Sequence, residues 1–243
     1  MKLHTETYGS GPLHVAVVHG LGGNGATWRP LIDLMLATGK YTVTTVDLRG
    51  HGKSERATSY AIEQFAADLA ENLPTGLDAI VGHSLGGPVL ARAIDRLQPR
   101  QAVYLDPGFH LSLPVSGVAG RLFWLVPVLS LGVAQVLQAR KTAGATSGYA
   151  PEVRALLDDA HRQFDRSMAI GVFRDVAFHP IAAATPAVPS TVILSDDSAA
   201  VFPDAVAAQF EAHGWVVRRL PNIHHDMQLE SPSRVFDELQ KLL

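Results

Sequence analysis

Four short apolar runs, separated by helix-like stretches, occupy the first 106 of the 243 residues. Each run is rich in Val or Ile and continuous rather than alternating, as in strands that are buried on both faces of a sheet. The sequence predicts these strands at 15–20, 41–47, 79–84 and 102–106, with helices at 26–38, 60–73 and 85–98. Alternation of strand and helix predicts an α/β fold, in which helices flank a mostly parallel central sheet.

The alternation stops between residues 107 and 187, where we find helix-like stretches and no convincing strand. It resumes with strands at 191–195 and 215–220, a helix opened by Pro203, and a last helix from about 231. We therefore expect a core domain made of 1–106 and 188–243, interrupted by a helical cap insertion at 107–187. Within the insertion, 122–139 carries no charge over 18 positions, the lower limit for a membrane span. Pro127 interrupts this run, and we expect a cap helix with an apolar face rather than an integral membrane span.

Composition excludes several classes of protein. Basic side chains number 20 against 23 acidic ones and form no long run, so we expect no nucleic-acid partner. The absence of cysteine excludes disulfides, thiolate metal sites and a cysteine nucleophile. The first twelve residues lack the apolar core of a signal peptide, which predicts a cytoplasmic protein.

The strongest chemical signal is the run Gly82-His83-Ser84-Leu85-Gly86 between a predicted strand and a predicted helix. A serine hydroxyl is a poor nucleophile unless it is presented to a base and its developing oxyanion is stabilised. A sharp strand-to-helix turn does both, and glycines two before and two after the serine let the neighbouring backbones crowd together. A glycine-lined turn with an idle serine is the plainer interpretation, and the surrounding strand and helix make it the weaker one.

Together with this run, three further motifs resemble the α/β-hydrolase superfamily. The run 82–87 (GHSLGG) is similar to the family's nucleophile elbow and 19–23 (HGLGG) to its oxyanion loop. The runs 47–54 (DLRGHGKS) and 224–232 (HHDMQLESP) resemble the loop after the family's fourth strand and the histidine loop before the last helix. The resemblance implies an eight-stranded sheet. Only one strand, at about 2–8, fits before the strand at 15–20, so we expect the family's first strand to be absent.

The family's catalytic residues follow the order serine, acid, histidine. For the histidine we favour His225 over His224, because His225 precedes Glu230 by the five positions that are usual in the family. For the acid, the resemblance favours Asp197 after the strand at 191–195, then Asp196. Asp106, at the end of the preceding strand, is a third option because some members of the family take their acid from that position.

By position, the oxyanion donors are the backbone N–H groups of Leu85 and Leu21. His19 can also be read as a metal ligand together with His51 or His83, but no spacing here matches a histidine metal motif. We therefore expect no metal and no cofactor.

One motif points to another class of protein. The run 20–25 matches G-x-G-x-x-G after a strand, and Asp47 ends the next strand, as in a nicotinamide-dependent oxidoreductase. Such an enzyme of the short-chain type needs a Tyr-x-x-x-Lys pair, and no tyrosine here has lysine four positions later. A hydrolase-like receptor that binds without turnover stays open, because fold alone does not exclude it.

The sequence thus predicts a serine hydrolase with a small-molecule substrate, acting on carboxylic esters through an acyl-enzyme. Lactones, thioesters, carbon–carbon bonds and acyl transfer use the same machinery and stay open, as does the oligomeric state. The cap supplies apolar side chains, which favour apolar substrates with longer acyl chains over anionic ones. The candidate pocket residues are Phe109, Phe123, Trp124, Phe164 and Met168.

Overall fold

A computed structural model describes residues 1–111, 113, 115–118, 123–124 and 149–243 of the chain. Most of the uncharged run at 122–139 therefore lies outside the described residues. Within the described part, no helix is long and apolar enough to cross a membrane.

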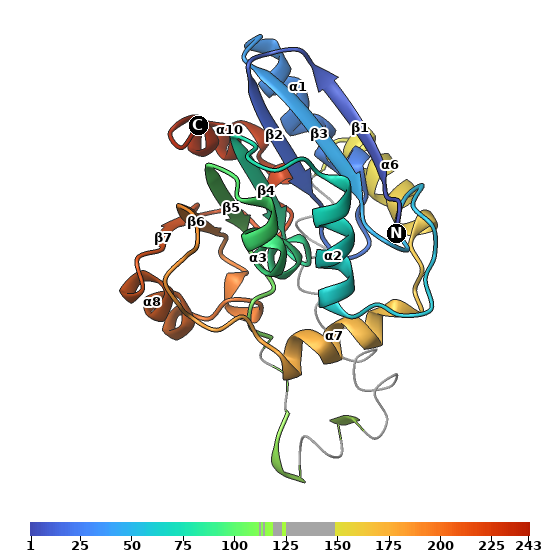
Figure 1. Ribbon diagram of the computed structural model, residues 1–243, viewed down its shortest axis with the longest axis vertical. Helices are drawn as coiled ribbons and strands as arrows, with labels where there is room; N and C mark the ends of the chain where they lie inside the picture. Colours follow the sequence, from blue (N-terminus) through green and yellow to red (C-terminus); the bar gives the residue numbers. More distant parts are fainter. Residues whose placement is uncertain (112, 114, 119–122, 125–148) are drawn as a thin grey trace.

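Seven strands form one sheet in the order β1-β3-β2-β4-β5-β6-β7 (Figure 1). The antiparallel strand β1 pairs with β3 at one edge, and every other neighbouring pair is parallel. This confirms the predicted fold class, with a single strand before β2. The strands are β1 (His4–Gly9), β2 (Leu13–Val18), β3 (Tyr41–Asp47), β4 (Ala79–His83), β5 (Gln101–Leu105), β6 (Ser190–Leu194) and β7 (Val216–Arg219).

Helices cover both faces of the sheet (Figure 1). The predicted helices of the first half correspond to α1, α2 and α3. The helices are α1 (Arg29–Ala37), α2 (Ile62–Asn72), α3 (Gly86–Leu97), α6 (Pro151–Gln163), α7 (Met168–Phe178), α8 (Asp204–Ala212), α9 (Met227–Glu230) and α10 (Pro232–Gln240), with short 3-10 turns η1 (Gly25–Trp28) and η2 (Ser198–Ala200).

The core consists of two apolar layers, one on each face of the sheet. Successive residues of a strand point to opposite faces, so Val18 packs into one layer and Val17 into the other. The first layer includes residues of α2, α3, α7 and α8, and the second includes residues of α1 and α10. The strands need apolar residues on both faces, which explains their continuous Val and Ile runs.

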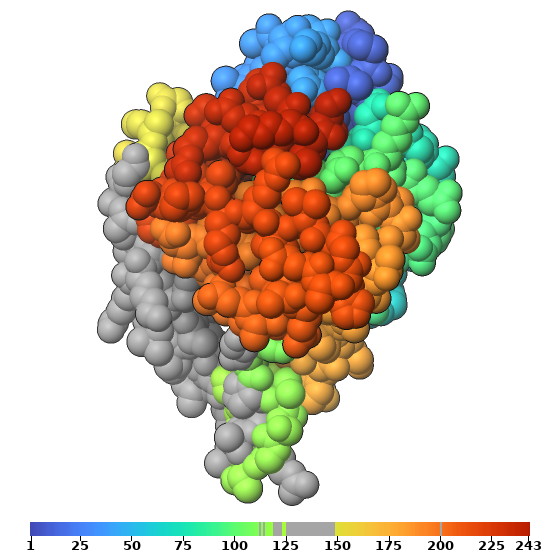
Figure 2. Space-filling model, turned by 90° about the vertical axis from the view of Figure 1, so that its left-hand side faces the viewer, coloured from blue at the N-terminus to red at the C-terminus, as the bar shows by residue number. Residues whose placement is uncertain are grey.

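The parallel strands bring their carboxyl ends to one edge of the sheet, where ligands bind in open α/β folds. The loops after β2, β3, β4, β5 and β6 all lie at this edge. In the face that Figure 2 shows, the C-terminal part of the chain, coloured orange to red, covers the centre.

Candidate active site

The turn between β4 and α3 presents the Ser84 side chain. Ser84 has φ of 49°, a left-handed conformation that is uncommon for a residue with a side chain. A Cβ on Gly82 would lie 2.6 Å from the carbonyl oxygen of Gly86, and one on Gly86 would lie 2.4 Å from that of Val18. Only glycine fits at these two positions, so the glycine spacing of the motif is a steric requirement of the turn.

The loop between β7 and α9 brings His225 to this serine. The Nε2 atom of His225 lies 2.9 Å from Ser84 Oγ. His83 holds the backbone of His225, because the His83 Nε2–H donates to the His225 carbonyl oxygen at 2.9 Å. Residues that are 141 positions apart in sequence are therefore in direct hydrogen-bond contact.

The carboxylate beside His225 is that of Asp106, the residue that follows β5. Its Oδ2 accepts a hydrogen bond from His225 Nδ1 at 3.2 Å. Its side chain is fully buried and also accepts the backbone N–H of Ser195 on Oδ1 at 2.7 Å and the Ser195 hydroxyl on Oδ2. A carboxylate is only an acceptor, so Nδ1 of His225 carries the proton and Nε2 is left to accept from the serine hydroxyl.

The prediction that Asp197 contacts the histidine was therefore wrong, and Asp106 takes that place. The Asp197 backbone N–H donates to Ser195 Oγ at 3.1 Å, while its buried Oδ2 has no hydrogen-bond partner among the described residues. Asp196 is exposed and accepts the N–H of Asn222 at 2.8 Å, which braces the loop before the histidine. Ser195 explains the difference, because its two hydrogen bonds hold the carboxylate of the neighbouring strand against His225.

Ser195 is the residue that sequence reasoning missed. It stands where the family usually has glycine, and that departure was the available signal. A serine in place of glycine adds one side-chain hydroxyl donor beside a candidate acid. In this fold the Ser195 hydroxyl donates to Asp106.

The electrostatic surroundings favour a protonated His225. Burial alone would lower its pKa, but the hydrogen bond to Asp106 and the charges of Asp106, Asp226 and Asp197 outweigh burial and raise the pKa above its usual value. An imidazolium at this position is therefore stabilised.

Glu230 contacts the neighbouring histidine. Its carboxylate accepts the backbone N–H of His224 at 2.8 Å and the His224 Nδ1 at 2.9 Å. This bond raises the pKa of His224, whose side chain is 43% exposed. The five-residue spacing thus identifies the histidine that contacts Ser84, although Glu230 binds the other one.

We expect His224→Ala to change kcat by no more than about threefold, because an exposed residue outside the site costs little. His225→Ala, in contrast, removes the group that contacts Ser84. Both variants are compared on one chromogenic ester, with circular dichroism to check folding. If His224→Ala were the more damaging variant, the histidine assignment would be off by one position.

Two backbone amides lie beside the serine. Leu85 directly follows Ser84 and starts α3, and Leu21 follows Gly20, at which an added Cβ would lie 2.9 Å from Ser84 Cβ. Among the described residues neither amide has a hydrogen-bond acceptor, so both N–H groups can donate to a developing negative charge.

The loop that matches G-x-G-x-x-G is held by Asp47. Its Oδ1 accepts the N–H of Gly25 at 2.7 Å and its Oδ2 accepts that of Lys53 at 2.8 Å. The Asp47 side chain is buried, and both its oxygens bind backbone amides. It therefore braces two loops of the site rather than facing a ribose.

The buried histidines near the site also form hydrogen bonds within the protein. The Nδ1 of His19 binds the carbonyl oxygen of Gly20 at 2.8 Å, and its Nε2 accepts the N–H of Leu48 at 3.0 Å. Burial lowers the pKa of His19 to about 4 and that of His83 to about 3. In the described ranges, no group of three or more His, Asp or Glu side chains could hold a metal ion.

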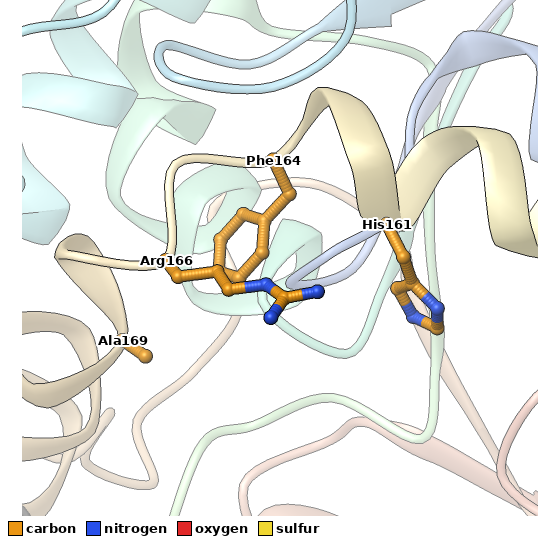
Figure 3. A pocket seen from close by; sticks show the side chains of 4 residues that line it. All are labelled: His161, Phe164, Arg166 and Ala169. Carbon is orange, nitrogen blue, oxygen red and sulfur yellow. The ribbon is translucent and has the colours of Figure 1, made fainter.

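A cavity of about 290 Å³ lies between α6 and α7 and is lined by His161, Phe164, Arg166 and Ala169 (Figure 3). It adjoins the oxyanion loop, because a Cβ on Gly22 would lie 3.2 Å from the His161 ring. Two of its four lining residues, His161 and Arg166, are basic or polar. The lining of this cavity therefore does not support the expectation that anionic substrates react poorly.

Of the five predicted pocket residues, Phe164 lines this cavity. Phe109 is fully buried in the core, where it packs against Phe202 and Phe210, and Met168 is buried as well. Neither side chain lines this cavity, and their place in a substrate pocket stays a prediction. Phe123 and Trp124 pack edge to face on each other, with ring centroids 5.2 Å apart.

Known proteins resemble both the sequence and the fold. The pimeloyl-[acyl-carrier protein] methyl ester esterase of Aliivibrio salmonicida is 32% identical over 112 residues, which cover 44% of this chain and 41% of that protein. Lipase LipV of Mycobacterium tuberculosis is 34% identical over 118 residues, which cover 46% and 44%. The match thus spans less than half the length of these two relatives.

A solved lipase-esterase related protein from Clostridium acetobutylicum shares the fold, with a TM-score of 0.74 at 15% identity over the full length of both chains. A family model described as the alpha/beta hydrolase family matches residues 15–238. The chain belongs to the alpha/beta hydrolase family.

Proposed function

We propose that the protein is a cofactor-free serine hydrolase that cleaves carboxylic ester bonds of small substrates. One observation carries this proposal, namely the unbroken hydrogen-bond path from Ser84 Oγ through His225 to the buried Asp106. The esterase and lipase names of the relatives support hydrolysis of esters.

In the first half of the reaction, Ser84 Oγ attacks the ester carbonyl while His225 Nε2 takes the hydroxyl proton. Asp106 keeps the imidazole in the required tautomer and stabilises its positive charge. The oxyanion of the tetrahedral intermediate accepts hydrogen bonds from the N–H groups of Leu21 and Leu85. His225 then protonates the departing alcohol, and an acyl group stays on Ser84.

In the second half, His225 removes a proton from water, which attacks the acyl-enzyme at the same carbonyl. Collapse of the second tetrahedral intermediate releases the carboxylic acid and returns the proton to Ser84. Lactones and thioesters pass through the same steps, and so does acyl transfer when an alcohol replaces water.

The test combines turnover with labelling of the serine. Purified protein is assayed with chromogenic esters before and after treatment with a serine-directed fluorophosphonate, and the modified residue is located by mass spectrometry. Stoichiometric label on Ser84 with parallel loss of activity supports the proposal. A protein that binds the esters without turning them over would be a receptor instead.

We further propose that residues 107–187 form a cap over the serine, since α6 and α7 belong to this segment and border the cavity. We expect kcat/KM to rise from acetyl to medium-length acyl esters. Each methylene buried against a wall such as Phe164 contributes about 0.8 kcal/mol, or about fourfold, until the pocket is full. A series of p-nitrophenyl esters measures the profile, and a flat or falling series would contradict an apolar acyl pocket.

A further inference from the structure

The loop motif at 47–54 places a buried imidazole directly against the oxyanion loop. His51 Nε2 lies 3.2 Å from the backbone nitrogen of Gly22, which donates to it. The other ring nitrogen, Nδ1, donates to the carbonyl oxygen of Arg49 at 3.0 Å. His51 is fully buried, and burial lowers its pKa to about 3, so the ring is neutral and its Nε2 accepts at any ordinary pH.

The two peptide units on either side of the Leu21 Cα are each held by a different histidine. The first unit contains the Gly20 carbonyl and the Leu21 N–H, and its carbonyl oxygen accepts from His19 Nδ1 and from the N–H of Gly23. In a trans peptide the carbonyl and the N–H point in opposite directions, so these bonds also aim the Leu21 N–H. The second unit contains the Gly22 N–H, which His51 holds.

The position of His51 is itself fixed from two sides. Its ring stacks on Phe164, with centroids 5.0 Å apart and planes 30° apart, and lies 4.8 Å from the ring of His19. Next to the stack, the N–H of Asp165 donates to the carbonyl oxygen of Gly50 at 2.8 Å. The segment between α6 and α7 thus packs on the loop that carries His51.

We propose that His51 is a positioning residue that holds the Leu21 N–H in line with the oxyanion of the transition state. The inference rests on the proposed ester hydrolysis at Ser84. Gly22 is buried, and removal of the imidazole takes away the acceptor that holds its N–H, which destabilises the present course of the loop. The Leu21 N–H then no longer points at the oxyanion. The stabilisation of the transition state decreases, while substrate binding is little affected.

The test compares two amide side chains at position 51. In His51→Asn the amide reaches the place of Nδ1 and leaves Gly22 without an acceptor. In His51→Gln the amide oxygen extends to the place of Nε2 and restores the acceptor. We expect kcat to fall about 10- to 100-fold in His51→Asn with KM changed less than about threefold, and to recover most of this loss in His51→Gln.

Two further measurements separate positioning from a structural role. Rates are normalised to active sites titrated with fluorophosphonate, so that partly unfolded protein does not count. An arylboronic acid, whose serine adduct places an oxygen in the oxyanion site, should bind more weakly to His51→Asn by about the factor lost in kcat/KM.

Tyr60→Phe is the matched control. It removes a 2.7 Å hydrogen bond that docks Asp165 on the same loop, and Tyr60 has no hydrogen bond to the oxyanion loop. We expect it to lower the melting temperature and to leave kcat per active site within about twofold. Equal kcat for wild type, His51→Asn and His51→Gln would overturn the role of His51 while Ser84 stays labelled. Absence of Ser84 labelling and turnover in the wild type would instead overturn the proposed function.

Discussion

Ser84→Ala is expected to lower kcat about 10³-fold or more and to leave the fold intact. In the proposed mechanism the hydroxyl oxygen forms the acyl-enzyme, and the serine, histidine and aspartate act as one unit, so no neighbouring group replaces it. Within the part of the chain that the structure describes, loss of Oγ removes one hydrogen bond, the one to His225. Turnover is measured on a chromogenic ester, with circular dichroism and thermal unfolding to compare the folded state.

Ser190→Ala is the control for removal of a buried hydroxyl. Ser190 begins β6 and its Oγ donates to the carbonyl oxygen of Val188, with no hydrogen bond to the site. Its loss should affect stability slightly and kcat by less than about twofold. Retention of more than about a tenth of wild-type turnover in Ser84→Ala would refute the assignment of the nucleophile.

Asp106→Asn is expected to lower kcat by about 10³- to 10⁴-fold. An amide at this position can donate to His225 Nδ1, which selects the tautomer whose Nε2 carries the proton and cannot accept from serine. The change also removes the negative charge that favours the imidazolium. Steady-state kinetics measure the loss, and Asn is close enough in shape to keep the surrounding loops in place.

Asp197→Asn makes the same chemical change one strand away. Its charge helps to raise the pKa of His225, so its loss should move the acidic limb of the kcat/KM profile to lower pH. We expect kcat at the optimum to stay within about tenfold of wild type. If Asp197→Asn were the more damaging variant, Asp197 rather than Asp106 would be the functional acid.

The fold was predictable because short stretches of sequence determine its strands. Runs such as 15–18 and 79–81 are apolar at every position, and only a sheet covered on both faces buries all of them. Apart from β3, the strands have bounds that differ by one or two residues from the expectation, as for β5, which begins at Gln101 and ends at Leu105. Such ends depend on hydrogen bonds across the sheet, which periodicity does not record.

The site was predictable where a residue in its sequence motif has few possible roles. A serine between two glycines after a strand has few interpretations, and its contact with His225 follows from the order of the loops. The acid was different, because aspartates follow the ends of two neighbouring strands, β5 and β6. The choice depends on where Ser195 donates, and a side-chain direction is set by three-dimensional packing. The contact of His51 with Gly22 escaped notice for the same reason.

The pairing of β4 with β5 has a consequence for how this enzyme family can diversify. His83 and Leu105 are partners in the ladder, so Ser84 and Asp106 each follow one member of the same pair. Their separation is thus set by the sheet and not by the 81 residues from 107 to 187. In the proposed mechanism the acid precedes the proposed insertion, so the nucleophile, the acid and both oxyanion amides all belong to the first 106 residues. The insertion can therefore be lengthened, shortened or exchanged, and substrate choice can change, without a compensating change in that catalytic geometry.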